Sequence, residues 1–169
     1  MSLLTAQDWS FLVPIRYGPH RIREIAEICH QKNMSSPLIV TDQGSANLPF
    51  VDAMQKDLTA AGMSPGLFSE ISPNPRDKDI FAGREAFRNG GHDGVIALGG
   101  GSGMDGGKAI SLLAYNDSDI WAFEYEKTPL EKKDYVAFPP LICVPTTAGT
   151  GAETESTAMV TDTEKVMKW

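Results

Sequence analysis

A cluster of glycines directly follows an apolar run near the middle of the chain. The run 94–98 leads into three glycines and a serine, Gly99, Gly100, Gly101 and Ser102. Because glycine has no Cβ, its backbone can approach an anion closely and adopt a positive φ. Free N–H groups at the start of the following helix favour negative charge. The pattern predicts a phosphate site, with the serine hydroxyl as an extra donor. The alternative is a glycine turn that serves only tight packing of strand and helix.

Two familiar phosphate-binding motifs do not fit this loop. A Walker loop needs glycine at Ser102 and serine or threonine at Ala109, although a Gly-Lys pair fits between them. The ordinary dinucleotide fingerprint closes the first strand–helix turn, with an acidic residue about 20 positions later. Here the first turn offers only Gly18, and the candidate acid, Asp42, precedes the glycines. The sequence therefore disfavours ATPase and GTPase activity.

Two aspartates are further candidates for nucleotide contact. Asp42 ends the buried run 37–41, at the strand terminus where open α/β sheets bind ligands. There it either bonds a ribose hydroxyl or forms an Asx turn with the residues that follow. Asp105 is less expected, since a carboxylate repels phosphate. It either caps the helix that carries Lys108 or bonds a ribose hydroxyl.

A second polar loop follows another buried run, 141–144. It reads Pro145-Thr146-Thr147-Ala148-Gly149-Thr150-Gly151-Ala152-Glu153. Three threonine hydroxyls within five residues exceed what a plain solvent turn needs, so we interpret this threonine loop (residues 145–153) as a second ligand-contacting segment at a strand end.

Short β-like runs alternate with helical periodicity along the chain, which predicts an α/β fold with a Rossmann-like parallel sheet covered by helices on both faces. Strands are expected over 37–41, 66–69, 94–98 and 141–144, and helices over 20–31, 50–61, 77–88 and 105–114. The segment 116–140 is interpreted as a surface excursion with a short helix. Residues 157–169 predict a hairpin whose second strand is unfinished, so we expect residues 1–169 to be an α/β domain of a longer protein.

Composition narrows the function class. The formal net charge is −7 with the charges interspersed, which argues against nucleic acid or an anionic membrane as partner. The two cysteines, Cys29 and Cys143, form no metal or redox motif and are interpreted as buried free thiols. Residues 1–11 contain no basic segment followed by an apolar stretch, and no apolar run approaches 18 residues, so neither a signal peptide nor a membrane span is expected. The cytoplasm is the expected location.

The two loops together resemble the iron-containing (group III) alcohol dehydrogenase family, in the superfamily of dehydroquinate synthase and glycerol dehydrogenase. The resemblance rests on the motif from Gly99 through Asp105 to Lys108 and on the threonine loop, with Pro73-Asn74-Pro75 and Asp42 in the expected places. It covers nearly the whole chain. The departures are Gly103, Gly106-Gly107 and Ala152, where the family commonly has other small residues, proline or serine.

The resemblance implies an N-terminal domain that binds NAD(P), with NAD favoured over NADP because Asp42 repels a 2′-phosphate. Gly99, Gly100, Gly101 and Ser102 are expected at the pyrophosphate, and Asp105 at a ribose or helix cap. The remaining expected contacts are Thr146, Thr147 and Thr150 at the adenine and phosphates, and Asn74 at the nicotinamide half. Lys168, in the terminal hairpin, resembles the family's cofactor-contacting lysine.

The resemblance also implies a divalent metal ion, usually Fe²⁺, bound by one aspartate and three histidines in a C-terminal helical domain. The three histidines of this chain, His20, His30 and His92, precede the glycine loop and are interpreted as surface or capping residues. The expected function is metal-assisted hydride transfer between an alcohol or aldehyde and NAD⁺, in a homo-oligomer. A lyase like dehydroquinate synthase, a polyol-phosphate dehydrogenase and a non-catalytic nucleotide-binding module remain alternatives.

Overall fold

The computed structural model describes residues 7–10, 13–124, 127, 131 and 136–168. It opens with an antiparallel hairpin of β1 (Gln7–Ser10) and β2 (Pro14–Tyr17). Strands and helices then alternate in the following order: η1 (Arg21–Glu24), α1 (Ile25–Gln31), β3 (Pro37–Asp42), α2 (Pro49–Ala60), β4 (Gly66–Ile71), α3 (Asp77–Asn89), β5 (Gly94–Gly99), α4 (Gly101–Leu113), η2 (Ile120–Phe123), β6 (Leu141–Pro145), β7 (Thr161–Asp162) and β8 (Met167–Lys168).

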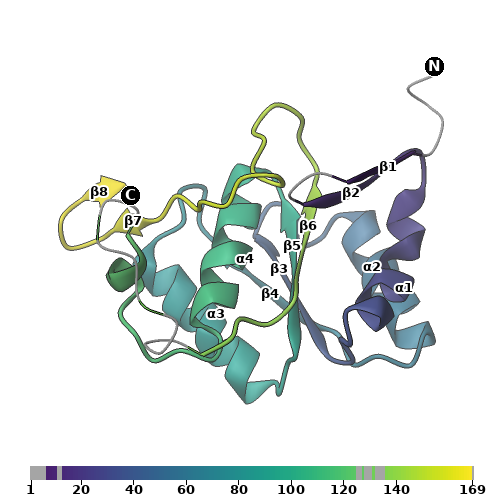
Figure 1. Cartoon of the computed structure of the whole chain (residues 1–169), viewed down its shortest axis with the longest axis horizontal. Coiled ribbons are helices and arrows are strands. Elements are labelled where there is room, and N and C mark those ends of the chain that lie inside the picture. Colours follow the sequence, from purple (N-terminus) through teal and green to yellow (C-terminus); the bar gives the residue numbers. More distant parts are fainter. Residues whose placement is uncertain (1–6, 11–12, 125–126, 128–130, 132–135, 169) are drawn as a thin grey trace.

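A four-stranded parallel sheet in the order β4-β3-β5-β6 forms the centre of the molecule. Helices α1 and α2 cover one face, and α3 and α4 cover the other (Figure 1). Both faces of the central strands are therefore buried. This agrees with the unbroken apolar runs that predicted these strands.

Alternating side chains of the central strands supply two separate cores. Leu38 and Val40 of β3 pack toward α3 and α4, where Phe87 and Ile110 are also buried. Ile39 between them faces α1 and α2 and joins the second core. Fully burying an aliphatic side chain of this size stabilises a fold by about 1.5–3 kcal/mol. A shift of β3 by one residue would turn these side chains to the opposite faces, so the two cores fix the register of the strand.

The strand order creates a switch point between β3 and β5. From β3 the chain moves outward to β4, and then returns through α3 to β5 on the opposite side of β3. The loops that leave β3 and β5 at their carboxyl ends therefore diverge and leave a crevice, which is where open parallel sheets bind ligands. Asp42 ends β3 and Gly99 ends β5, so both residues border this crevice.

The α/β class, the parallel sheet and a C-terminal hairpin are confirmed, and three details are corrected. Helix α4 begins at Gly101, four residues before the predicted start at Asp105. The first strand of the terminal hairpin is β7, not 158–160, because Val160 is buried in the core beside α3 and α4. The β1–β2 hairpin was not predicted. Within 116–140 the expected short helix is η2, and residues 125–126, 128–130 and 132–135 lie outside the described part.

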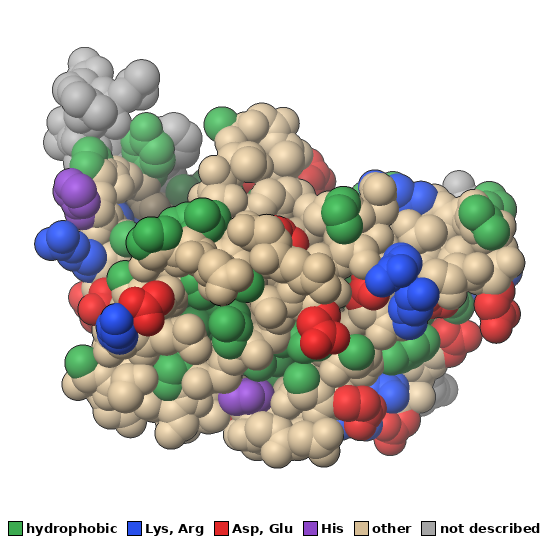
Figure 2. Space-filling model, turned by 180° about the vertical axis from the view of Figure 1, so that it is seen from behind, with side chains coloured by type: hydrophobic (Ala, Val, Ile, Leu, Met, Phe, Trp, Pro, Cys, Tyr) green, Lys and Arg blue, Asp and Glu red, His purple; other side chains and the backbone are tan. Residues whose placement is uncertain are grey.

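The intermingled surface charges and the free state of both cysteines agree with what the composition indicated. Acidic and basic side chains are intermingled on the face shown in Figure 2. Both cysteines are free: Cys29 is buried and Cys143 half-buried on β6. Burial raises the pKa of the Cys29 thiol to about 11, so this group is protonated and unreactive at neutral pH. None of the helices in the described part of the chain combines the length and apolar composition needed to cross a bilayer.

Candidate nucleotide-binding site

The glycine loop turns the chain directly from β5 into α4. Gly99 has a φ of +144°, a conformation that side-chain-bearing residues rarely adopt. Gly100 is the N-cap of α4, and no side chain from the described residues caps the helix there. Because the first N–H groups of a helix have no intrahelical acceptor, this N-terminus presents free donors and a positive dipole end at the crevice.

The threonine loop lies directly beside the glycine loop. Strand β6 pairs with β5, and the main-chain N–H of Thr146 donates to the Gly99 carbonyl at 2.9 Å. A Cβ added at Gly100 would lie 3.2 Å from Thr147 Oγ1, which is tighter than nine in ten real Cβ contacts. One at Gly101 would lie 3.5 Å from the nearest atom of Thr150. The absence of Cβ atoms thus keeps the space between the two loops open.

The carboxylate of Asp42 borders the glycine loop and also forms the Asx turn considered from the sequence. Its two oxygens accept from the Ser45 N–H and hydroxyl, each at 2.9 Å. A Cβ on Gly99 would lie 3.3 Å from Asp42 Oδ2. Since each carboxylate oxygen has a second lone pair, this arrangement holds the carboxylate in place and leaves acceptor capacity toward the crevice.

A hollow of about 430 Å³ opens between the carboxyl ends of β3 and β4, and it includes residues that sequence reasoning missed. It is lined by Asp42, Gln43, Gly44, Glu70, Ile71, Ser72, Pro73 and Arg76. Glu70 was overlooked because β4 was expected to end at Ser69, whereas it continues to Ile71. Arg76 stands next to the Pro73-Asn74-Pro75 turn, and no spacing rule in the sequence placed it near Asp42.

The guanidinium of Arg76 is engaged with Asp79 at the start of α3. Its Nη2 lies 2.8 Å from Asp79 Oδ1, and its main-chain N–H donates to Oδ2 at 3.1 Å. Burial alone would raise the pKa of Asp79, but hydrogen bonds from Arg76 and Ser72 outweigh it, so the pKa is lowered. The ion pair fixes the turn that forms one rim of the hollow.

Asn74 and Lys168 meet at the other end of the crevice. Lys168 Nζ donates to Asn74 Oδ1 at 3.1 Å, which joins strand β8 to the proline-rich turn. The Ser102 hydroxyl donates to the Pro73 carbonyl and links that turn to the glycine loop. The Ser102 hydroxyl was expected to be an extra donor to a phosphate, but in this structure its hydrogen is directed at the Pro73 carbonyl. All eleven predicted site residues lie on the loops and helix start that border the crevice, or on elements hydrogen-bonded to them.

Asp105 lies one turn into α4, half-buried. Burial raises its pKa above the usual value of 3.8, although an N–H from Met159 and the charges of Lys108 and Lys168 oppose the increase. It is therefore not the helix cap considered from the sequence, because Gly100 occupies the N-cap.

We expect Asp105→Asn to stabilise the chain at neutral pH. A raised folded-state pKa means that ionising the carboxyl costs more in the folded than in the unfolded chain. This cost is full above the folded pKa and disappears below the unfolded pKa. The asparagine variant should melt at a higher temperature than the parent at pH 7, and the gap should be much narrower at pH 4 and vanish about one pH unit below the usual pKa of 3.8. An equal gap at both pH values would contradict the assignment.

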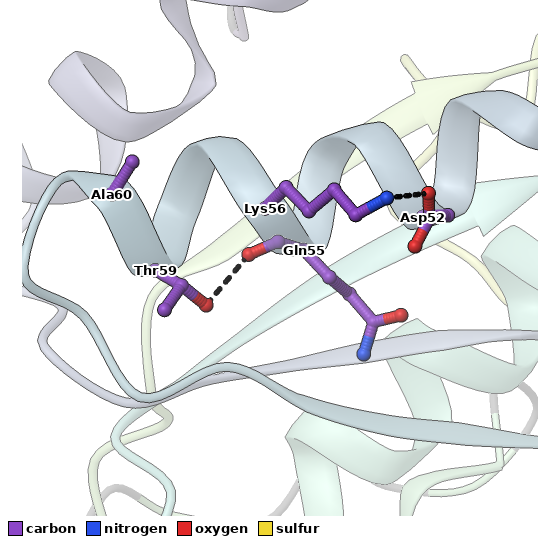
Figure 3. Close-up of a pocket in the computed structure, with 5 residues that line it drawn as sticks. All are labelled: Asp52, Gln55, Lys56, Thr59 and Ala60. Carbon is purple, nitrogen blue, oxygen red and sulfur yellow. Dashed lines mark hydrogen bonds and ion pairs between the residues drawn. The ribbon is translucent and has the colours of Figure 1, made fainter.

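A second hollow lies over α2 but has no features of a ligand site. All of its lining residues come from one face of this helix: Asp52, Gln55, Lys56, Thr59 and Ala60 (Figure 3). The Lys56 ammonium pairs with Asp52 at 2.6 Å, and the Thr59 hydroxyl donates to the Gln55 carbonyl. These groups satisfy one another on an exposed helix surface, away from the strand ends.

None of the three histidines lines the hollow between β3 and β4. His20 and His30 are exposed, and the half-buried His92 places Nδ1 3.0 Å from the Ser36 carbonyl. Among the described residues, no group of three or more histidine, cysteine, aspartate or glutamate side chains is arranged to hold a metal ion.

Comparison with known proteins places this geometry in a family. Residues 13–169 match the family model for iron-containing alcohol dehydrogenase. The choline dehydrogenase of Bacillus subtilis (strain 168) is 34% identical over 164 residues, which are 95% of this chain and 40% of that protein. The chain thus spans about 40% of the length of such curated relatives.

Solved structures give the same result. The crystal structure of 1,3-propanediol oxidoreductase matches with a TM-score of 0.80 and 32% identity, over 89% of this chain and 38% of that one. Sulfoacetaldehyde reductase from Bifidobacterium kashiwanohense, solved in complex with NAD⁺, matches with a TM-score of 0.74 and 27% identity, over 89% and 39% of the two chains. With its glycine loop, threonine loop and parallel sheet in this arrangement, the chain belongs to the iron-containing alcohol dehydrogenase family.

Proposed function

We propose that residues 1–169 form the dinucleotide-binding domain of an NAD-dependent alcohol dehydrogenase. The observation that carries the proposal is the convergence of three loops on the uncapped start of α4, at the switch point of the sheet. Backbone donors hold a pyrophosphate without a basic patch, so the net charge of −7 is no obstacle. The NAD⁺ in the structure of sulfoacetaldehyde reductase supports the same choice of ligand.

The roles of the residues follow from their positions. The main-chain N–H groups of the glycine loop and of Ser102 would bind the pyrophosphate, and the hydroxyls of the threonine loop would line the phosphates and adenine. Asp42 would accept a hydrogen bond from the adenosine ribose. Asn74 and Lys168 would lie at the nicotinamide half, where their mutual hydrogen bond orients both side chains.

The reaction proposed for the whole protein is reversible hydride transfer between an alcohol or aldehyde and the bound cofactor. NAD⁺ supplies the redox chemistry when bound, and this domain supplies binding and orientation. Since the described residues offer no metal site, we assign the divalent ion, Fe²⁺ by family, to a domain outside these residues. We also propose a homo-oligomer. Purified alone, the chain of 169 residues is expected to bind NAD without turning over alcohol, and robust alcohol oxidation would contradict this.

Titration calorimetry with NAD, NADP and ADP tests the nucleotide assignment. NAD is expected to bind the parent at least about tenfold more tightly than NADP, which corresponds to about 1.4 kcal/mol of repulsion between Asp42 and the 2′-phosphate. Asp42→Asn removes the charge but keeps an acceptor for the Ser45 N–H, and should reduce the preference severalfold. Asp42→Gly should reduce it further.

Two results would overturn these assignments. A parent chain that binds NADP as tightly as NAD would refute the role of Asp42. A parent that binds none of the three nucleotides would refute the proposed function.

A further inference from the structure

The segment between the threonine loop and the terminal hairpin crosses α4 without secondary structure of its own. We call residues 155–160 the strap. In Figure 1 the chain runs from the top of β6 over the start of α4 to β7 and β8 beside α3. The strap belongs to no strand ladder or helix, so its main-chain polar groups need partners from elsewhere.

Lys108 and Asp105, one turn apart on α4, provide these partners. Lys108 Nζ donates to the Glu155 carbonyl at 2.8 Å and to the Thr157 carbonyl at 2.9 Å. The Asp105 carboxylate accepts from the Met159 N–H. Hydrogen bonds with one charged partner are about twice as strong as neutral ones. Asp105 and Lys108, on successive turns of α4, thus hold three main-chain groups of the strap.

The strap in turn leads into the hairpin that carries Lys168. At its far end the Thr161 N–H donates to the Pro75 carbonyl at 2.7 Å, and the Thr163 hydroxyl donates to Asp77 at 2.8 Å. Lys168 then reaches Asn74. Fixing the strap therefore fixes the approach of β8 to the proline-rich turn. The turn and β8 hold the two side chains assigned to the nicotinamide half.

We propose that Lys108 is a positioning residue, which tethers the strap to α4 so that Lys168 and Asn74 are preorganised for the nicotinamide half of the cofactor. This inference rests on the proposed function. The Lys108 ammonium is engaged by two main-chain carbonyls of the strap, which accounts for its position without a contact to the cofactor. When a variant releases the strap, the competent arrangement is populated for only part of the time, and apparent affinity falls by that fraction.

NAD and ADP separate this role from direct contact, because ADP lacks the nicotinamide half. Calorimetry on the full chain of 169 residues should show that Lys108→Met weakens NAD binding on the order of tenfold and ADP binding less than about twofold. Lys108→Arg keeps a charged donor and should restore most of the NAD affinity. Lys56→Met, on the exposed face of α2, is the matched control and should change neither affinity. In Lys108→Met, hydrogen exchange of strap amides should accelerate while exchange in β5 stays unchanged.

The outcomes that would overturn the inference differ from one another. Equal weakening of NAD and ADP would mean that Lys108 contacts the shared diphosphate or supports the whole fold. Unchanged NAD affinity in Lys108→Met would mean that the strap needs no tether. If the parent binds neither NAD nor ADP, both the proposed function and the inference are refuted. If the parent binds both and Lys108→Met binds them equally well, only the inference is refuted.

Discussion

Gly107→Val is expected to destabilise the chain by about 3 kcal/mol, a large share of the roughly 5–15 kcal/mol that stabilises a typical domain. Helix α4 packs closely on β5 at this position. A Cβ on Gly107 would lie 2.3 Å from the Cβ of Ala97 and 3.0 Å from its Cα. Neither atom belongs to a flexible side chain, so relief requires the helix to move away from the sheet.

Helix propensity predicts the opposite sign for this substitution. Valine is favoured over glycine in a helix by a few tenths of a kcal/mol, so destabilisation isolates the packing effect. Ala82→Val on the exposed face of α3 is the control and should cost less than about 1 kcal/mol. Urea denaturation followed by circular dichroism measures both variants. A loss below about 1 kcal/mol for Gly107→Val would show that α4 can shift without penalty.

Gly101→Asp is expected to abolish nucleotide binding while leaving the fold intact. A carboxylate in the first turn of α4 interacts favourably with the helix dipole, which stabilises by about 0.3–1 kcal/mol. The same charge stands where the pyrophosphate is proposed to bind, and like-charge juxtaposition costs several kcal/mol, or on the order of 100-fold in affinity. The new Cβ would make only ordinary contact with Thr150, at 3.5 Å.

Gly101→Asn is the matched control, because asparagine has nearly the same shape and no charge. Calorimetry with NAD should show a modest loss for asparagine and a far larger loss for aspartate. The difference should shrink at high ionic strength, since salt screens exposed charges. Equal affinities for the two variants would place the pyrophosphate elsewhere, and thermal denaturation confirms that both are folded.

The sequence was sufficient to locate the ends of β3, β5 and β6 to within one residue, and hence most of the loops that border the crevice. The apolar runs that lead to Asp42, Gly99 and Pro145 form parallel strands, and parallel strands present their carboxyl ends at one edge. Their loops must then meet, as the contact between Thr146 and Gly99 illustrates. The run 141–144 was expected to be buried, but β6 is half-buried to exposed because among the described strands it pairs with β5 alone. The outline of the crevice follows from periodicity and topology alone.

The start of α4 was misplaced because intrinsic propensity was outweighed by packing. Glycines at the beginning of a helix disfavour it by about 1 kcal/mol each, which pointed to a start at Asp105. In the structure a Cβ at Gly103 would lie 2.7 Å from the Leu98 carbonyl, so close approach to β5 requires glycine there. The residues that weaken the helix locally are those that allow it to pack.

The contacts of the strap could not be predicted for a different reason. Lys108 binds main-chain carbonyls 47 and 49 residues away, and a carbonyl is present at every residue, so it carries no sequence signal. Glu70 and Arg76 were missed similarly, because their place at the hollow depends on the last residues of β4 and on how α3 begins.

The edge position of β6 links nucleotide dissociation to local opening of the sheet. Among the described strands it is an edge strand, paired with β5 alone, and edge elements open locally at lower free energy than central ones. The threonine loop is formed only while β6 is docked, so half of the proposed site vanishes whenever this strand detaches. A nucleotide that contacts both the glycine loop and the threonine loop would link the ends of β5 and β6. Bound nucleotide should therefore lower the rate at which β6 detaches from β5, and each detachment of β6 should speed the dissociation of the nucleotide.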